Sequence, residues 1–291
     1  MTTRLLILAG GASTRMKKET QVPRSLDASL LEQANTRTKG MIGVGKGGKS
    51  LIDYLLFNAH RAGFTDVLLL LHPCDTVTQA YYVQKMKNGR LCNMTLNFTR
   101  QTFPVSQQKP AGTADAVYQA LVQHPSWQQQ RFVVCTSDKL YSVKALKLLS
   151  QSEYPNALIS YDCKALEYPE ARIKEFALIK ADPEGFVEKI IEKPTDEQAN
   201  TLLESQCRQG MGISMNLFLM DGGTMFPILK ATPFHRHRNE KELPTSVRLY
   251  GKLYGQGFFT IPVAEHVPAL TSKTDLPVVQ EYIAQHYQEA F

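Results

Sequence analysis

Residues 4 to 16 read Arg-Leu-Leu-Ile-Leu-Ala-Gly-Gly-Ala-Ser-Thr-Arg-Met, and the rest of the chain is best interpreted from this stretch. Arg4 to Ala9 is almost continuously apolar and has strand length, which is typical of a strand buried on both faces of a sheet. The pair Gly10-Gly11 lets backbone N–H groups converge on an anion, and Ser13-Thr14-Arg15 adds hydroxyl and guanidinium donors. The stretch predicts a first β-strand that ends in a phosphate-binding loop.

Outward from this strand, apolar strand-like runs alternate with helical periodicity. Strands are predicted at Arg4–Ala9, Thr65–Leu71, Asn93–Thr99, Phe132–Thr136 and Ala157–Asp162, and helices at Leu51–Ala62, Thr76–Lys87, Ala114–Gln123 and Val143–Leu149. This alternation predicts an α/β fold with a mostly parallel central sheet and helices on both faces. Because ligands of such sheets bind beyond the carboxyl ends of the strands, the loops after strands are where chemistry is expected.

The pattern changes after about residue 155. A β-hairpin is predicted from Phe176–Lys180 and Phe186–Glu192 around the turn Asp182–Gly185, and we interpret it as a lid-like insertion. The later elements expected are helices at Thr195–Ser205, Gly222–Lys230, Glu240–Tyr250 and Lys273–His286, and strands at Met211–Leu219 and Phe258–Val263. No repeat or low-complexity linker divides the sequence, which favours one domain over residues 1–291.

Composition excludes several classes of protein. With 43% hydrophobic residues among 291, the chain has ordinary globular composition, and no apolar run approaches the roughly 18 residues of a membrane span. Its five cysteines are an odd number without C-x-x-C spacing, so we expect a reducing cytoplasmic location. Residues 1–60 hold nine Lys and Arg against four Asp and Glu, which suits a compact polyphosphate better than a nucleic acid; a solvated basic face is the alternative.

A second glycine-rich string, Gly43-Val-Gly-Lys-Gly-Gly-Lys49-Ser50, matches the P-loop pattern and precedes a helical segment. In that interpretation Lys49 is the essential lysine, and Asp138 is the acidic partner. A phosphate-type loop already follows the first strand, however, and the segment before Gly43 is too short for a strong buried strand. A P-loop NTPase therefore stays an alternative.

Two further loops carry residues suited to nucleotide chemistry. Gly112, in Gln107–Ala116, permits close backbone approach, and the Gln107 amide can pair with a base edge; a helix start capped by Thr113 is the structural alternative. Asp138 follows the strand Phe132–Thr136, where a carboxylate can hold Mg²⁺ on phosphate oxygens, and the lysine of Glu192-Lys193-Pro194 can neutralise a second phosphate. A surface aspartate and a lysine before a helix are the plain alternatives.

Together these motifs resemble the sugar-phosphate nucleotidylyltransferases, the family of nucleotide-sugar pyrophosphorylases that includes glucose-1-phosphate thymidylyltransferase. Leu8–Met16 is similar to Leu-Ala-Gly-Gly-x-Gly-Thr-Arg-Leu, and Thr38–Leu55 is similar to Pro-Lys-x-Leu-x-Pro-Val followed by Gly-Lys-Pro-Leu-Ile. Gly112-Thr-Ala and Glu192-Lys-Pro match almost literally. The resemblance implies a Rossmann-like nucleotidyltransferase fold and the reaction NTP + sugar 1-phosphate → NDP-sugar + pyrophosphate.

The resemblance also implies a division of labour along the chain. Residues 1–155 would form the nucleotide-binding half, 156–265 the sugar-phosphate-binding half, and 266–291 a C-terminal helix. NTP and sugar 1-phosphate are the expected partners, Mg²⁺ is the expected cofactor, and neither nucleic acid nor membrane is expected; helices late in the chain could form a homo-oligomer face.

Site residues are carried over by position. Arg15, Lys39, Asp138 and Lys193 would be catalytic; Ala9, Gly10, Gly11, Ser13, Thr14, Gln107, Gly112 and Thr113 would bind the nucleotide; Glu192, Lys193 and Asn216 would bind the sugar phosphate; and Asp138 and Glu242 would bind the metal. The protein would contribute orientation and charge neutralisation, without a covalent intermediate.

Three departures from the family pattern limit these expectations. Lys17–Arg37 is about twice the usual span, with a helix expected at Leu26–Gln33, and could form an extra lid. Thr245 stands where the family often has the second metal-binding aspartate, so Glu242 is the substitute candidate. Ala177 and Asn216 stand where glycines are common near the sugar. A transferase for another phosphate, such as phosphocholine or a molybdopterin cofactor, and a catalytically silent nucleotide-sugar-binding subunit stay open.

Overall fold

The computed structural model describes residues 1–18, 22–23, 26–89, 94–103, 110–198, 200 and 211–288. Its strands are β1 (Arg4–Ala9), β2 (Asp66–Leu71), β3 (Thr95–Arg100), β4 (Arg131–Thr136), β5 (Ala157–Tyr161), β6 (Ala177–Ala181), β7 (Val187–Ile191), β8 (Met211–Ser214), β9 (Phe218–Asp221) and β10 (Phe259–Val263). Its α-helices are α1 (Thr14–Lys17), α2 (Ala28–Thr36), α3 (Leu51–Arg61), α4 (Val77–Lys87), α5 (Thr113–Gln123), α6 (Val143–Ser150), α7 (Glu170–Ile173), α9 (Gly222–Ala231), α10 (Leu243–Tyr254) and α11 (Asp275–His286). Short 3₁₀ turns are η1 (Lys39–Met41), η2 (Lys46–Gly48) and η3 (Pro125–Trp127).

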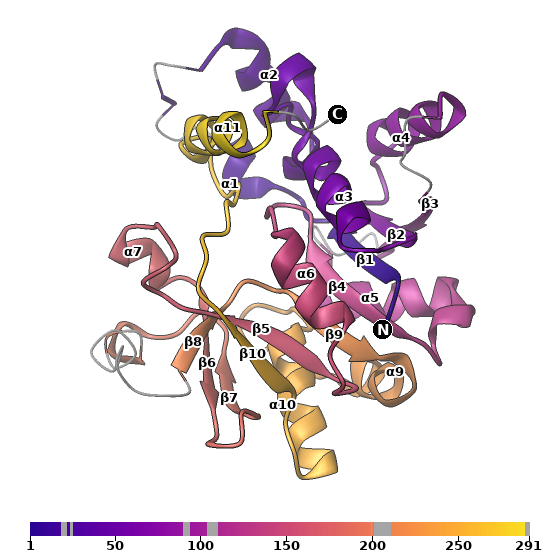
Figure 1. Ribbon diagram of the computed structural model, residues 1–291, viewed down its shortest axis with the longest axis vertical. Helices are drawn as coiled ribbons and strands as arrows, with labels where there is room; N and C mark the ends of the chain where they lie inside the picture. Colours follow the sequence, from indigo (N-terminus) through magenta and orange to yellow (C-terminus); the bar gives the residue numbers. More distant parts are fainter. Residues whose placement is uncertain are drawn as a thin grey trace.

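In the described part of the chain, one sheet of ten strands has the order β3-β2-β1-β4-β9-β5-β8-β6-β7, with β10 added beside β5 (Figure 1). β3, β2, β1 and β4 are parallel, as is the pair β5–β10. The pairings of β9 and β8 are antiparallel. The predicted α/β class with a central sheet is confirmed, and the parallel part carries the loop Gly10–Thr14 that is predicted to bind phosphate.

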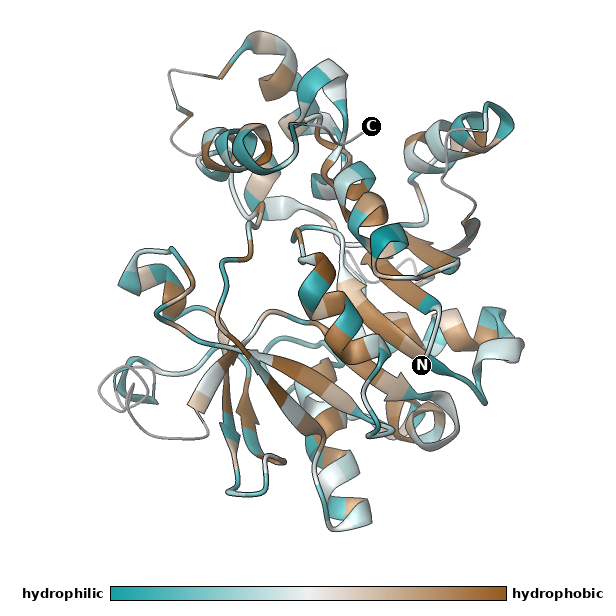
Figure 2. Ribbon diagram, viewed as in Figure 1, coloured by the Kyte–Doolittle hydropathy of each residue, from teal (hydrophilic) through white to brown (hydrophobic). Residues whose placement is uncertain are grey.

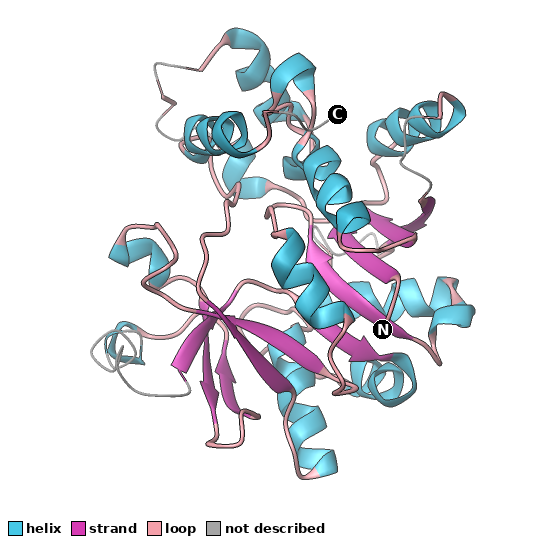
Figure 3. Cartoon of the chain, in the orientation of Figure 1, coloured by secondary structure: helices cyan, strands magenta, loops and turns pink. Residues whose placement is uncertain are grey.

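Helices cover both faces of this sheet, as Figure 3 shows. On each face an apolar layer packs the helices against the sheet. The strand residues alternate between the layers: Leu5 and Ile7 of β1 pack on the face that includes α3 and α6, and Leu6 and Leu8 pack on the face that includes α5 and α9. Because β1 is buried on both faces, its side chains are apolar at every position after Arg4 (Figure 2).

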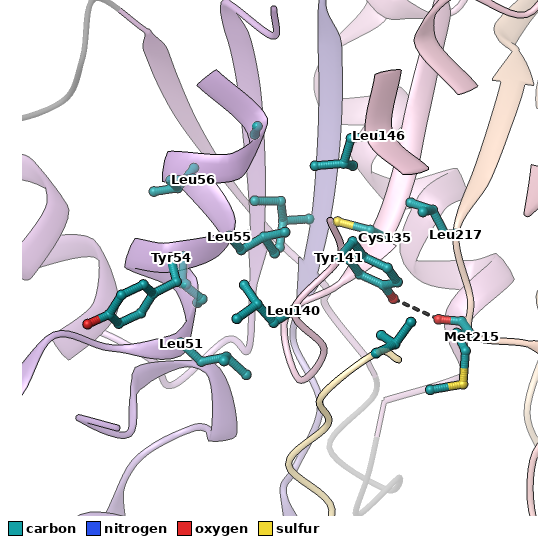
Figure 4. Packing of buried hydrophobic residues seen from close by; sticks show 14 of the residues in the cluster. Leu51, Tyr54, Leu55, Leu56, Cys135, Leu140, Tyr141, Leu146, Met215 and Leu217 are labelled. Carbon is teal, nitrogen blue, oxygen red and sulfur yellow. Dashed lines mark hydrogen bonds between the residues drawn. The ribbon is translucent and has the colours of Figure 1, made fainter. Parts of the chain in front are cut away.

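Helix α3 shows how the sequence builds the first layer. Ser50 caps it, since its hydroxyl accepts from the Asp53 N–H and the Asp53 carboxylate accepts from the Ser50 N–H. Its apolar face, with Leu51 and Leu55, packs towards Leu140 and Tyr141 (Figure 4). This contact places the loop after β4 against α3.

The structure corrects one predicted strand. Met211–Leu219 is two strands, β8 and β9, because Asn216 adopts a left-handed backbone with φ of 60° that cannot continue a strand. The Tyr141 hydroxyl donates to the carbonyl of Met215 at 2.7 Å and stabilises this break (Figure 4). The break brings Asn216 to the carboxyl end of β4.

The hairpin predicted as a lid is β6–β7, and it forms the edge of the central sheet, where β6 pairs with β8. The expected helix Thr195–Ser205 lies partly outside the described residues; 196–198 and 200 are helical. No helix in the described part of the chain is long and apolar enough to cross a membrane.

Candidate active site

A cavity of about 360 Å³ lies at the carboxyl ends of β1 and β4. Its walls come from the loop after β1, the turn before η1, the start of α5, the loop after β4 and the segment after β7. The position follows from the parallel pairing of β1 with β4, which brings the ends of both strands to one edge of the sheet. We call this cavity the donor pocket.

All but two of the site residues predicted from sequence line the donor pocket. They are Ala9, Gly10, Gly11, Ser13, Thr14, Lys39, Gly112, Thr113, Asp138, Glu192, Lys193, Asn216 and Glu242. Gln107 lies outside the described residues. Arg15 lines a second, adjoining cavity, so the structure gathers residues that are more than 200 positions apart in the chain.

The second cavity, of about 1180 Å³, is called the acceptor pocket here. It shares four residues with the donor pocket, namely Asp138, Glu192, Lys193 and Asn216. Its outer wall is α7 and the residues after it, where Glu175 lies 3.5 Å from the exposed Arg15 guanidinium. The two pockets therefore meet at one group of charged side chains.

Asp138 is the carboxylate at the junction of the two pockets. Its oxygens lie 3.2 Å from the Lys139 ammonium and 3.5 Å from the Lys39 ammonium. Burial disfavours the carboxylate, but the charges of Lys139 and Lys39 outweigh burial and hold the pKa of Asp138 well below its usual range. Asp138 is therefore ionised at any physiological pH.

For Lys39, unlike Asp138, the effect of burial on the pKa outweighs the effect of the opposite charge. Burial lowers the pKa of its ammonium, the carboxylate of Asp138 opposes that effect, and the cations Lys139 and Arg15 add to it. Its side chain is 14% exposed. A weakly hydrated cation that faces a pocket is suited to bind phosphate oxygens, because the anion supplies the solvation that burial removed.

Glu242, predicted as a metal ligand, is engaged by another residue. Both of its oxygens accept from the Arg238 guanidinium at 2.6 Å. Glu192 faces this pair, and burial followed by the charge of Glu242 raises the pKa of Glu192. Glu242 therefore reaches the donor pocket as half of an ion pair.

Mg²⁺ fits this set of residues in one way. Among the described residues no group of three or more His, Cys, Asp or Glu is arranged to hold a metal ion. Asp138, however, is an ionised carboxylate on the wall of the donor pocket, and Mg²⁺ commonly binds one or two carboxylates and completes its shell with substrate phosphates and water. The site therefore suits an ion that arrives with a polyphosphate.

Backbone conformation singles out the same cavity. In the described part of the chain, four residues other than glycine have positive φ, and Ser13, Lys193 and Asn216 among them line the donor pocket. Such conformations cost about 1 to 3 kcal/mol each and concentrate at ligand sites. Gly112, at φ of 104°, lies so close to Lys241 that an added Cβ would be 2.4 Å from the Lys241 carbonyl oxygen.

Gln101 is a polar residue of the donor pocket that sequence reasoning missed. Gln101, one residue beyond β3 and 3% exposed, donates from its amide nitrogen to the Gly112 carbonyl at 3.1 Å and to Asp115 at 2.9 Å. Because both partners accept, the amide orientation is set, and its oxygen is the end left for a ligand. A glutamine two residues after the predicted strand Asn93–Thr99 was the available signal.

The P-loop-like string occupies a different place. Gly43–Ser50 follows the turn η1 instead of a strand, and it forms η2 and the cap of α3. It lines neither the donor nor the acceptor pocket. The structure thus assigns these glycines to a turn that leads into α3.

Comparisons with known proteins agree with this geometry. A glucose-1-phosphate adenylyltransferase of Rhodopseudomonas palustris (strain BisB18) is 24% identical over 96% of this chain and 62% of that enzyme. One from Vibrio cholerae serotype O1 (strain ATCC 39315 / El Tor Inaba N16961), named glucose-1-phosphate adenylyltransferase 1, is 23% identical over 97% of this chain and 65% of that enzyme. The chain thus spans less than two thirds of the length of these curated relatives.

Two further comparisons address fold and family. A solved structure of UDP-glucose pyrophosphorylase complexed with UDP-glucose superposes with a TM-score of 0.69 over 98% of this chain and 99% of that chain, at 16% identity, and so shares the fold. The family model described as Nucleotidyl transferase matches residues 30–223, which is most of the chain. This protein belongs to the nucleotidyl transferase family.

Proposed function

We propose that the protein transfers a nucleotidyl group from an NTP to a sugar 1-phosphate and releases pyrophosphate. One observation carries the proposal: the donor and acceptor pockets share Asp138, Glu192, Lys193 and Asn216. Two anionic substrates bound in adjoining pockets would meet at these residues. Relatives named glucose-1-phosphate adenylyltransferase support a sugar phosphate as acceptor.

In the proposed reaction the loop Gly10–Thr14 cradles the triphosphate through backbone N–H groups and hydroxyls. Gly112 and Gln101 line the donor pocket where the base would bind. The amide of Gln107 is proposed to pair with the edge of the base. Lys39 neutralises the negative charge of the phosphates under attack. Arg15 leaves its ion pair with Glu175 and binds the triphosphate. These residues bind and orient the donor.

On the acceptor side Lys193 holds the sugar phosphate, and Glu192 and Asn216 accept and donate hydrogen bonds to sugar hydroxyls. A phosphate oxygen then attacks the α-phosphorus in line while its bond to the β-phosphate oxygen breaks and pyrophosphate leaves. Orientation and charge neutralisation supply the rate, because phosphoryl chemistry of this kind needs no covalent intermediate with the protein.

Asp138 would hold Mg²⁺, with Glu242 as a second ligand if a substrate displaces Arg238 from it. When bound, the ion would neutralise negative charge on the phosphates. The cysteines described, Cys74, Cys135 and Cys163, are free thiols, which supports the proposal of a reducing cytoplasmic location. We further propose that the protein acts on small molecules and binds neither nucleic acid nor a membrane. Helices late in the chain would form the contact face of a homo-oligomer.

A second candidate function is a nucleotide-sugar-binding subunit without turnover. The observation that favours it is the Arg238–Glu242 pair, which engages both oxygens of the predicted second metal ligand. It predicts that the protein binds nucleotide sugar and releases no pyrophosphate.

The deciding experiment measures pyrophosphate released by the purified protein with Mg²⁺, pooled NTPs and pooled sugar 1-phosphates, with each pool also omitted. Release that needs both pools and is lost in Asp138→Ala supports the transferase. Orthophosphate from NTP alone would indicate an NTPase. No release, with nucleotide-sugar binding retained by folded protein, would favour the binding subunit, and release with phosphocholine or a cofactor phosphate would change the acceptor.

A further inference from the structure

The segment between β10 and α11, residues 264–274, runs beside the acceptor pocket, which its Thr271 lines, and we call it the strap. It leaves the end of the sheet at Val263 and passes beside α7 on its way to α11 (Figure 1). It lies beyond residues 30–223, which the family model matches. Val267, Ala269 and Leu270 of the strap are buried.

The strap is paired with the loop that carries Asp138. The Leu270 N–H donates to the Asp138 carbonyl at 2.8 Å, and the Leu140 N–H donates to the Pro268 carbonyl at 2.9 Å. Lys139 and Ala269 form an antiparallel β-bridge between these bonds. The backbone of Asp138 is therefore held by the strap on one side and, through the neighbouring Ser137 N–H, by the carbonyl of Leu8 in β1 on the other.

The strap also holds the wall of the acceptor pocket through Arg172 of α7. The Arg172 guanidinium donates to both carboxylate oxygens of Asp275, to the Thr271 hydroxyl at 3.2 Å and to the Ala269 carbonyl at 3.3 Å. It lies over the Tyr168 ring at 4.4 Å, and the Tyr168 hydroxyl donates to the strap. A helix of four residues has little stability of its own, so these contacts fix where α7 lies.

Asp275 joins these contacts at one carboxylate. Besides Arg172, it accepts from the N–H groups of Thr271 and Ser272 at 2.6 and 2.9 Å, and it is 5% exposed. Two residues before it, the almost fully buried Lys273 donates to the Lys18 carbonyl at the end of α1, which follows the phosphate loop. The start of α11 thus contacts the wall of the acceptor pocket, the strap and the end of α1.

We propose that Asp275 is a positioning residue for the transfer: through Arg172 and the strap it sets the separation between the acceptor wall and Asp138. This inference rests on the proposed function for its kinetic consequence, and on the geometry alone for its structural one. An in-line reaction is sensitive to such spacing, because a misplacement of about 1 Å can lower a rate by roughly a hundredfold.

The test compares Asp275→Asn, which keeps the size of the side chain and removes its charge, with wild type. We expect kcat to fall by about ten- to a hundredfold and the acceptor KM to rise, while the NTP dissociation constant changes less than about twofold. The matched control is Asp221→Asn, which alters a helix-capping carboxylate outside both pockets and should leave all three quantities unchanged.

A double-mutant cycle with Arg172→Met tests the route of the effect. If Asp275 acts through Arg172, the double variant is no slower than the slower single variant. Arg172→Met also serves as the second probe if Asp275→Asn fails to fold. Fully additive losses would overturn the proposed route.

Hydrogen exchange gives a readout that needs no catalysis. In Asp275→Asn the amides of Leu270 and Leu140, which join strap and Asp138 loop, should exchange faster, whereas the amides of α5 should not. If wild type releases no pyrophosphate, the proposed function fails and this exchange pattern alone decides the positioning. Unchanged exchange, or a variant with wild-type kcat and acceptor KM, would overturn the inference.

Discussion

The Lys39 ammonium lies 3.5 Å from a carboxylate oxygen of Asp138, across the junction between the donor and acceptor pockets. The two residues are 99 positions apart, and the pairing of β1 with β4 brings the end of β4 beside the loop after β1 that Lys39 contacts through Ser13. Each side chain shifts the proton equilibrium of the other, so substitutions at either should have consequences that depend on charge.

Asp138→Asn should reduce pyrophosphate release by about a hundredfold or more, because the charge that would hold Mg²⁺ is lost. In the absence of metal the same variant should bind NTP as tightly as wild type or a few times more tightly, since Lys39 and Lys139 lose their anionic partner. Titration of nucleotide in EDTA measures this. Weaker metal-free binding would contradict the assignment.

Lys39→Met should stabilise the protein while it lowers activity. The pKa of Lys39 is lower in the folded chain than in the unfolded one, so its charge costs folding free energy at neutral pH, and that cost fades as pH rises through the folded pKa towards the ordinary lysine range. Removing this cost should raise Tm at pH 7, on a scale of roughly 2 to 4 °C for each ~1 kcal/mol removed. A scanning calorimetry series from pH 7 to alkaline pH should show the gain shrink; a lower Tm at pH 7 would contradict it.

The kcat/KM for the sugar phosphate should fall at acid pH, because Glu192 becomes protonated there. Its folded pKa is raised by burial and by Glu242, so protonation, which weakens its acceptance of sugar hydroxyls, begins above the ordinary glutamate range. The neutral form stabilises the fold at low pH, and this contribution is lost as pH rises through the folded pKa. Glu242→Gln should move the limb of kcat/KM to lower pH, whereas an unmoved limb would assign it to another group.

Gly112→Ala should destabilise the fold by about 3 kcal/mol or more, because both a positive φ and a close backbone contact oppose a side chain there. Gly255→Ala is the matched control: it shares the positive φ and an added Cβ meets no atom within 4 Å. The control should cost about 1 kcal/mol. Urea unfolding curves compare the two, and equal losses would show that contact with Lys241 contributes nothing.

Arg15→Ala and Lys49→Ala separate the two phosphate loops. Arg15 is proposed to leave Glu175 and bind the triphosphate, so its loss should raise the NTP KM about tenfold. Lys49 lies outside both pockets, and its loss should change the rate by no more than about twofold. The reverse order of sensitivity would restore the P-loop hypothesis.

Local patterns were enough to predict most elements of the fold. The apolar run of β1 and the helical periods of α3 and α5 are properties of neighbouring residues, and they appear in the structure within a few positions of the predicted bounds. The break between β8 and β9 was not predictable in this way, because Asn216 has its unusual backbone where Tyr141, distant in sequence, donates to Met215.

Motifs likewise located the loop after β1, which is proposed to bind phosphate, since convergent N–H groups and nearby hydroxyls are local chemistry. The pairing of Glu242 with Arg238, the orientation of Gln101 and the strap contacts of Asp275 depend on side chains that meet only after folding. The residues from 4 to 16 therefore predicted the fold class, which the structure confirms, and a phosphate ligand, which stays a proposal. Which charges neutralise one another, and how far apart the two pockets lie, follows from long-range packing, because distances between separate segments are set by the sheet and the strap that join them.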